Sequence, residues 1–327
     1  MAPVKQAADV RESATAVPVL VCRDLRKAFG DLVAVDGVSL SIAPGETYGL
    51  LGPNGAGKTT TISMVAGLLD PDAGQVLIAG QPMTPTSVGV KALCGYVPQE
   101  VAIYPDLTGR ENLRFFASLY GLRGRAARQR IGEILDTVGL AARSGDLAKK
   151  YSGGMQRRLN IGIGLLHKPS LLILDEPTVG VDPQSRNAIL ESVEALARAG
   201  MAVLYTTHYM EEAQRLCDRV GIIDEGRLKA EGTPRELVAL VGEQDRVHLE
   251  ASGALAEAAR ACAAIPGVRQ AAVAGSAIDV IAEHGGAPLP RLLETAAAAG
   301  AHVNSVEVTE PNLEAVFLHL TGRALRD

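Results

Sequence analysis

A glycine-rich loop at residues 52–59 constrains this chain more than any other feature. Its sequence, Gly-Pro-Asn-Gly-Ala-Gly-Lys-Thr, fits the phosphate-loop pattern G-x-x-x-x-G-K-[ST]. An apolar strand-like run, residues 47–51, precedes the loop, and a helix is predicted over residues 59–69. Glycines let the backbone approach a phosphate closely, and successive N–H groups then form an anion site. The loop predicts an α/β nucleotide-binding domain but leaves open which nucleotide it binds, and for what work.

The end of this loop carries the side chains that would handle the nucleotide. Lys58 is expected to reach the β- and γ-phosphates, and the Thr59 hydroxyl is expected to hold Mg²⁺. The following helix adds its positive N-terminal end. The other residues expected to bind the nucleotide here are Asn54, Gly55, Ala56, Gly57 and Thr60.

Length and composition limit the remaining possibilities. A chain of 327 residues fits about two domains, and its net charge of −5 gives no basic field for nucleic acid. The four cysteines are scattered, which argues against a disulfide framework or a zinc site. No run approaches the roughly 18 apolar residues of a membrane span. Residues 1–18 lack the apolar core of a secretory signal and are expected to form a disordered tail.

Two adjacent carboxylates follow the apolar run 171–174. Ligands bind at the carboxyl ends of strands in open α/β sheets, so these groups are placed for chemistry. Because adjacent strand residues point to opposite sides, the two need not share one role. Asp175 is placed to orient Mg²⁺, and Glu176 to act as the general base for an attacking water. A polar strand end with a turn at Pro177 is the plainer alternative.

Three further residues are candidates for contact with the nucleotide. His208 follows the apolar run 202–205 and can donate to a γ-phosphate. Gln99, after a Val-Pro turn, is a neutral ligand for Mg²⁺ or its water. Phe29 either stacks on a base or packs in the core; both interpretations remain open.

A Ser-Gly-Gly sequence, Ser152 to Gly154, precedes the helix-like stretch 156–167. Taken alone, it is more simply a flexible turn with a helix cap. It also has the form of a second anion site at a helix N-terminus. One reason for a second site in one chain would be a nucleotide held by another copy.

The order of strand-like and helix-like segments predicts two domains. Up to about residue 241, short apolar strands alternate with helices, which indicates a parallel sheet covered on both faces. Residues 108–151 are predicted to be helical. From residue 242 a β-α-β-β-α-β plan with a final helix is predicted, with segments at residues 246–250, 254–264, 268–273, 277–282, 288–299, 302–308 and 313–320.

Together these motifs resemble the nucleotide-binding subunit of ATP-binding cassette (ABC) transporters. Walker A is residues 52–59, Walker B is residues 171–175 and the catalytic carboxylate is Glu176. The Q-loop residue is Gln99, the signature is residues 152–154, the D-loop is residues 179–182 and the H-loop residue is His208. The resemblance covers residues 19–240. It implies a P-loop NTPase core with an antiparallel β subdomain and a helical subdomain, plus a small C-terminal α+β domain.

The resemblance also implies roles and boundaries. Two cassettes would sandwich two ATP molecules head to tail, with ATP and Mg²⁺ as the bound groups. Catalysis would fall to Lys58, Glu176 and His208, the metal to Thr59, Gln99 and Asp175, and the contacts in trans to Ser152, Gly153, Gly154, Met155 and Asp182. The cassette would span residues 19–241, its helical subdomain about 101–155, and an accessory or regulatory domain 242–327.

The signature departs from the usual sequence at its ends. Tyr151 and Met155 stand where Leu and Gln are usual, and a Met side chain cannot make the usual amide contact. This variant, and the ending at residues 310–323, resemble the ATPases of type-2 exporters such as daunorubicin and multidrug-resistance pumps. The implied function is to power efflux of a drug, an antibiotic or another hydrophobic or lipid-linked cargo. The implied setting is a homodimer bound peripherally to a separate polytopic permease at the cytoplasmic face of the inner membrane, without nucleic acid.

Other members of the same family were weighed against this interpretation. A non-transport ABC ATPase of translation or DNA repair would bring a coiled-coil insertion, two cassettes or a basic patch, and the sequence has none of these. The signature variant and the C-terminal ending argue against an importer ATPase. A degenerate cassette is disfavoured because Lys58, Asp175, Glu176 and His208 are all present.

Overall fold

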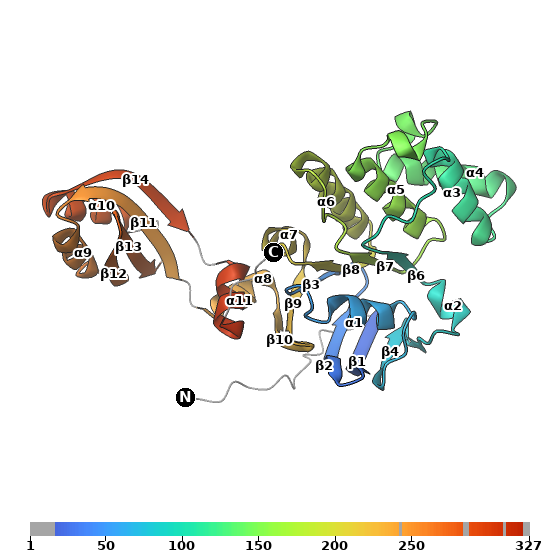
Figure 1. Ribbon diagram of the computed structural model, residues 1–327, viewed down its shortest axis with the longest axis horizontal. Helices are drawn as coiled ribbons and strands as arrows, with labels where there is room; N and C mark the ends of the chain where they lie inside the picture. Colours follow the sequence, from blue (N-terminus) through green and yellow to red (C-terminus); the bar gives the residue numbers. More distant parts are fainter. Residues whose placement is uncertain (1–16, 242–243, 284–287, 310–311, 323–327) are drawn as a thin grey trace. The chain divides into compact units, whose positions relative to one another are not determined.

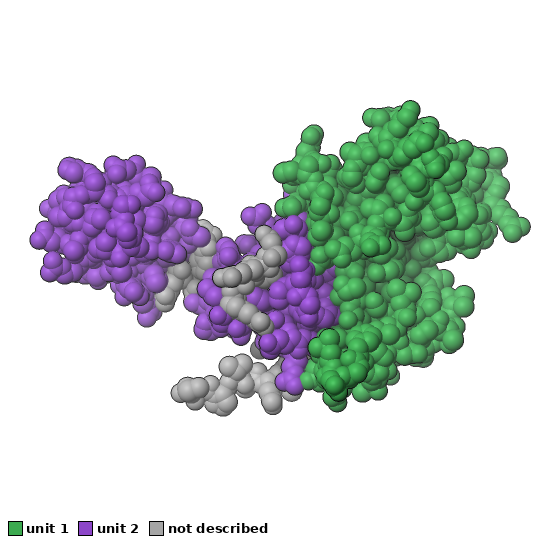
Figure 2. Space-filling view, viewed as in Figure 1, with its two compact units in different colours: residues 1–47, 59–205 green, residues 48–58, 206–327 purple. Residues whose placement is uncertain are grey.

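The computed structural model describes residues 17–241, 244–283, 288–309 and 312–322. It divides into two compact units, residues 1–47 with 59–205, and residues 48–58 with 206–327 (Figure 2). Among the described residues, no helix is both long enough and apolar enough to span a bilayer.

The first unit contains an antiparallel sheet of four strands in the order β2-β1-β4-β5. Buried and exposed side chains alternate around Val38, since Val38, Leu40 and Ile42 are buried while Ser39 is exposed. The antiparallel part of the expected fold class is therefore confirmed. The strands are β1 Leu20–Phe29, β2 Leu32–Ile42, β4 Ala73–Ile78 and β5 Gln81–Pro82 (Figure 1).

A second sheet has six strands in the order β10-β9-β3-β8-β7-β6. The pairs β3–β9 and β6–β7 are parallel, and β9 and β10 form an antiparallel hairpin. All residues of β3 and β7 are buried, as expected for strands of a parallel sheet with both faces covered. The strands are β3 Thr47–Leu51, β6 Cys94–Val97, β7 Leu171–Asp175, β8 Ala202–Thr207, β9 Arg219–Asp224 and β10 Arg227–Gly232.

The helices begin at caps that the sequence signals. Thr108 and Glu111 form a capping box at the start of α3, and Asp182 caps α6 by accepting from Ser185 N at 2.9 Å. One prediction is wrong: the helix after the glycine-rich loop ends at Val65 and does not reach residue 69. The chain turns at Gly67, whose φ of +66° suits glycine after a helix end. The helices are α1 Lys58–Val65, α2 Val88–Lys91, α3 Gly109–Leu119, α4 Gly124–Thr137, α5 Gly153–Leu165 and α6 Pro183–Arg198, with 3₁₀ turns η1 Ala141–Arg143 and η2 Ala148–Lys150.

After β8 the chain forms α7 Met210–Leu216, the β9–β10 hairpin and α8 Pro234–Ala239, and then the predicted β-α-β-β-α-β plan. The antiparallel sheet has the order β12-β13-β11-β14, and α9 and α10 bury one face of it around Leu249, Val280 and Leu292 (Figure 1). The elements are β11 Gln244–Gly253, α9 Leu255–Ala263, β12 Val268–Ala274, β13 Ala277–Glu283, α10 Leu289–Ala298, β14 Ala301–Thr309 and α11 Leu313–Thr321. The last helix, α11, buries Leu313, Val316 and Phe317 and contacts α8 and α7.

Candidate nucleotide-binding and hydrolysis site

The glycine-rich loop follows β3 in the second unit. Its first residue, Gly52, donates its N–H to Thr207 O at 3.4 Å, and Gly226 N donates to Ala56 O at 3.0 Å. A Cβ on Gly52 would lie 2.2 Å from Ile223 O, so no larger residue fits. Gly57 has φ of +101°, a conformation that other residues rarely adopt. Close packing and backbone conformation together explain the glycines.

Lys58 is folded into this loop. Its side chain is buried at 4 % exposure, and Nζ donates to Gly52 O at 2.7 Å and to Pro53 O at 3.1 Å. A buried ammonium beside a turn of backbone N–H groups is the charge arrangement that a phosphate requires. The loop therefore fits the phosphates of a nucleotide.

The end of β7, in the first unit, holds the two carboxylates that the sequence singles out. Asp175 is 1 % and Glu176 6 % exposed. Glu176 has φ of +44°, an uncommon conformation for a residue with a side chain, and such strain is concentrated at functional sites. The structure brings Gln99 to this place, since Gln99 Nε2 lies 3.5 Å from Glu176 Oε2. A carboxylate and an amide oxygen belong to the oxygen donors that Mg²⁺ prefers.

Neighbouring groups show that Asp175 lies in a poorly solvated place. Burial, and then the negative charge of Asp175, raise the pKa of the Tyr96 hydroxyl to about 12. Burial also lowers the pKa of the Arg157 guanidinium, while Tyr205 and Asp175 act in the opposite direction. Charges interact more strongly in such surroundings than in water, so Asp175 is well placed to bind a cation.

His208 is the first residue after β8, because this strand runs two residues past the predicted end and includes Thr206 and Thr207. Thr207 fixes the turn: its hydroxyl donates to Glu212 Oε2 at 2.9 Å and accepts from Tyr209 N at 2.9 Å. The His208 ring packs at 4.2 Å from the Tyr209 ring.

The Ser-Gly-Gly sequence forms the start of α5. Ser152 Oγ accepts from Met155 N at 3.2 Å, so the expected helix cap is present. Gly154 packs against α6, where a Cβ on it would lie 2.2 Å from Ser185 Cβ. Since Ser185 N donates to Asp182, the structure brings the signature and the residue that caps α6 together.

Phe29 and Tyr151 resolve two points that the sequence leaves open. Phe29 is 51 % exposed at the end of β1, with Lys27 Nζ 5.9 Å from its ring centroid, so the core interpretation is wrong. Tyr151 is buried, and its hydroxyl donates to Arg143 O at 2.8 Å. Tyr151 is therefore a packing residue next to the signature. Met155 is half-buried.

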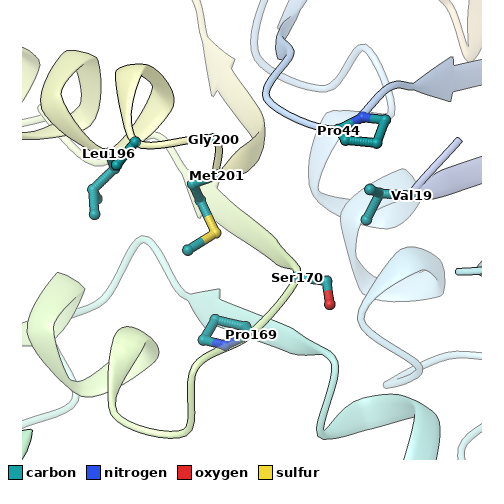
Figure 3. Close-up of a pocket in the computed structure, with 8 residues that line it drawn as sticks. Val19, Pro44, Pro169, Ser170, Leu196, Gly200 and Met201 are labelled. Atoms are coloured by element: carbon teal, nitrogen blue, oxygen red, sulfur yellow. The ribbon is translucent and has the colours of Figure 1, made fainter. Parts of the chain in front are cut away.

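A pocket of about 290 Å³ lies elsewhere in the first unit (Figure 3). Its lining includes Pro169 and Ser170, which directly precede β7, and Met201, which directly precedes β8. It therefore lies at the amino ends of these strands, opposite to the end that carries Asp175. No titratable side chain lines it, so it offers no group for acid–base chemistry.

Comparison with known proteins identifies the family. The ABC transporter family model matches residues 35–179. The linearmycin resistance ATP-binding protein LnrL of Bacillus subtilis (strain 168) is 47 % identical over 312 residues, which cover 94 % of this chain and 100 % of LnrL. This chain belongs to the ABC transporter family. It is an ATP-binding subunit of that family of ATPases, and its relatives are proteins of drug resistance and export.

Other comparisons agree with this assignment. The daunorubicin resistance ATP-binding protein DrrA3 of Streptomyces coeruleorubidus is 39 % identical over 303 residues, covering 90 % of this chain and 93 % of DrrA3. A solved structure described as the ATP binding subunit of an ABC transporter is 32 % identical with a TM-score of 0.61. It covers 68 % of this chain and 93 % of its own. The predicted ABC ATPase fold is thus confirmed, and ABC ATPases of this kind work with a separate membrane permease subunit.

Sequence reasoning missed one residue of the site in this ABC ATPase. Arg157 is 5 % exposed on α5, and its Nη1 donates to Pro98 O at 3.2 Å and to Gln99 O at 2.5 Å. Its sequence position gives no sign of this role, because the carbonyls it binds lie far away along the chain.

Proposed function

We propose that this chain is the ATP-hydrolysing motor of an exporter for a drug, an antibiotic or another hydrophobic cargo. The observation that carries the proposal is the buried Asp175–Glu176 pair, with Glu176 held at φ of +44° and Gln99 beside it. A buried, strained carboxylate lowers stability, and such groups persist where chemistry needs them. The names of the relatives, for linearmycin and daunorubicin resistance, support a drug-type cargo.

Hydrolysis follows from the roles of these side chains. Backbone N–H groups of residues 54–60 and Lys58 bind the phosphates of ATP. Thr59, Gln99 and Asp175 would hold Mg²⁺, which neutralises charge on the phosphates. Glu176 accepts the proton of the attacking water, and His208 donates to the γ-phosphate. Phe29, exposed at the end of β1, stacks on the adenine base.

The chain works as a homodimer in this proposal. Ser152, Gly153 and Asp182 are exposed at the starts of α5 and α6, where helix N-termini favour an anion. With Gly154 and Met155 they bind the ATP held by the second copy. Residues 19–241 form the cassette, with a helical subdomain at about 101–155, and residues 242–327 form an accessory domain.

An exposed aromatic patch supports the permease as partner. Tyr104, Phe115, Leu119 and Tyr120 are 46 %, 38 %, 67 % and 44 % exposed, and the Tyr104 and Phe115 ring centroids are 4.8 Å apart. Phe115 and Leu119 lie on α3, Tyr104 precedes this helix and Tyr120 is its C-cap residue. Exposed apolar patches of this kind mark interaction sites. The permease would dock here and hold the chain at the cytoplasmic face of the membrane.

Capture of the partner tests the proposal. The tagged Glu176→Gln chain would be expressed in its native cell, and membranes would be solubilised with ATP and Mg²⁺. We expect a polytopic membrane protein to co-purify. Phe115→Ser with Leu119→Ser should abolish the capture, whereas the control Leu32→Ser should keep it, since Leu32 is 67 % exposed on β2. Recovery only with ribosomes or DNA would overturn the proposal.

A further inference from the structure

Arg157 is a buried cation whose hydrogen bonds go to backbone carbonyls, an arrangement that costs folding free energy. Arg157 is 5 % exposed, and the bonds that its Nη1 donates go to the neutral carbonyls of Pro98 and Gln99. Its Nε is buried and has no hydrogen-bond partner within the described part of the chain. Burying a cation without a bonded carboxylate costs free energy, and a neutral side chain would pack at lower cost. We therefore take the hydrogen bonds to these two carbonyls as the reason why an arginine stands at this position.

The segment that Arg157 holds carries the Q-loop residue. Residues 98–104 are neither helix nor strand, so no regular pattern of backbone hydrogen bonds fixes them. The carbonyl of Gln99 accepts from Arg157, while its side chain lies 3.5 Å from Glu176. The direction of the Gln99 side chain depends on this backbone, so Arg157 is placed to act on Glu176 through Gln99.

Arg157 lies about one turn from the signature on the same helix. The helix α5 begins at Gly153, and its residue Gly154 packs on Ser185 of α6. A helix moves as one body, so a shift at its start reaches Arg157 and then the Gln99 carbonyl. We propose that Arg157 is a positioning residue that couples the signature to Gln99. When the signature of one copy binds the ATP held by a second copy, the shift of α5 would place Gln99 of the first copy for hydrolysis of the ATP that this first copy holds. This inference rests on the proposed function.

The next residue provides a matched control. Arg158 is also a partly buried guanidinium on α5, and burial likewise lowers its pKa. Its Nη1 donates to two loop carbonyls, Val138 O at 3.0 Å and Gly139 O at 3.4 Å. Its Nε is also buried without a hydrogen-bond partner among the described residues. The two arginines thus make the same kind of contact, but only Arg157 contacts a residue of the site.

The experiment compares Arg157→Met with Arg158→Met in the purified full-length chain, each alone and with Gln99→Ala. ATP hydrolysis is measured as kcat, KM for ATP and the Mg²⁺ concentration for half-maximal rate, together with the unfolding midpoint. We expect both substitutions to shift the unfolding midpoint similarly. Arg157→Met should lower kcat by about 10- to 100-fold, the loss typical of a misplaced group, and raise the Mg²⁺ requirement. Arg158→Met should change neither.

A double-mutant comparison separates positioning from stability. In a Gln99→Ala background, Arg157→Met should cost no further activity, because both changes remove the same contribution. Arg157→Lys should restore part of kcat, since an ammonium also donates to carbonyls. Equal effects of the two methionine variants, or full additivity with Gln99→Ala, would overturn the inference alone. If Gln99→Ala itself hydrolyses ATP normally, the proposed role of Gln99 fails and the inference fails with it.

Discussion

The nucleotide-binding region and the C-terminal sheet differ in what they bury. Up to Asp224 the interior contains charged and polar side chains, among them Lys58, Arg157, Asp175 and Glu176. Within residues 244–322, in the part that the structure describes, every buried side chain is apolar or a cysteine. Both regions nevertheless form well-packed sheets with helices against them.

The difference separates groups kept for folding from groups kept for chemistry. A sheet and two helices need only apolar contacts, as the β11–β14 sheet demonstrates. A buried charge opposes folding, so its presence calls for another reason. In the C-terminal region the linked charges Arg246, His248 and Asp279 lie on the sheet face opposite to its core. Substitutions in the two regions should therefore affect different measurements.

The largest effect is expected from Glu176→Gln. Removal of a general base should lower ATP hydrolysis by about 10²- to 10⁴-fold. ATP binding should be kept, because the amide has the same shape, and the unfolding midpoint should not fall, because a buried charge is removed. Phosphate release and nucleotide binding check this, with Glu191→Gln, an exposed residue of α6, as control. Normal turnover in Glu176→Gln would remove this residue from the role of base.

Leu292→Ala should lower stability and leave ATP hydrolysis unchanged, the opposite of Glu176→Gln. Leu292 is fully buried in the core between α10 and the C-terminal sheet, and its truncation should cost about 2–5 kcal/mol of local stability. Amides of β11 and β13 should exchange faster with deuterium, while ATP hydrolysis stays unchanged. If the alanine variant fails to fold, the milder Leu292→Met keeps the comparison testable. A loss of hydrolysis as large as that of Glu176→Gln would refute the separation of roles.

The sequence predicted most of what is encoded locally. A cap needs only residues three apart, and the helix cap expected at Ser152 is present. The order of strands and helices after residue 242 is likewise confirmed, because each segment has its own period of apolar residues.

What the sequence did not predict depends on distant contacts. The bonds from Arg157 to Pro98 and Gln99 join residues 59 and 58 positions apart, and neither end shows a local signal. The exposure of Phe29 depends on what packs around β1. The packing of α11 against α8 and α7 was not predicted for the same reason, since its apolar residues do not specify a partner.

A smaller effect is expected from Phe29→Ala. An aromatic pair contributes about 0.5–1.5 kcal/mol, so loss of the ring should weaken ATP binding by roughly 2- to 10-fold. The rate at saturating ATP should be kept, since Phe29 contacts no reacting group. Titration with a fluorescent ATP analogue would measure this, and Phe29→Tyr should bind normally. Unchanged binding in Phe29→Ala would leave the exposed ring without a role at the nucleotide.

The smallest effect is expected in the C-terminal sheet. Asp279 accepts from Arg246 Nη2 at 2.5 Å and lies 2.6 Å from His248 Nδ1. The hydrogen bond from Arg246, and then that from His248, hold the pKa of Asp279 below its usual value against the effect of burial. The stabilisation is therefore present above the unfolded-state pKa of about 3.9 and is lost as pH falls through the folded-state value. Because the Arg246 side chain is 61 % exposed, solvent screens the pair and Asp279→Asn should cost less than about 1 kcal/mol.

Hydrogen exchange of the β11 and β13 amides in Asp279→Asn and the unmodified chain measures this difference. It should be present at neutral pH and shrink as the medium is acidified, while ATP hydrolysis at neutral pH stays the same. A difference that grows with acidification would contradict the conclusion that the ionised Asp279 carboxylate stabilises the sheet. A carboxylate on the exposed sheet face thus changes local stability slightly. A carboxylate buried at the end of β7 changes the rate of hydrolysis, because a charge interacts more strongly with its neighbours when it is shielded from water.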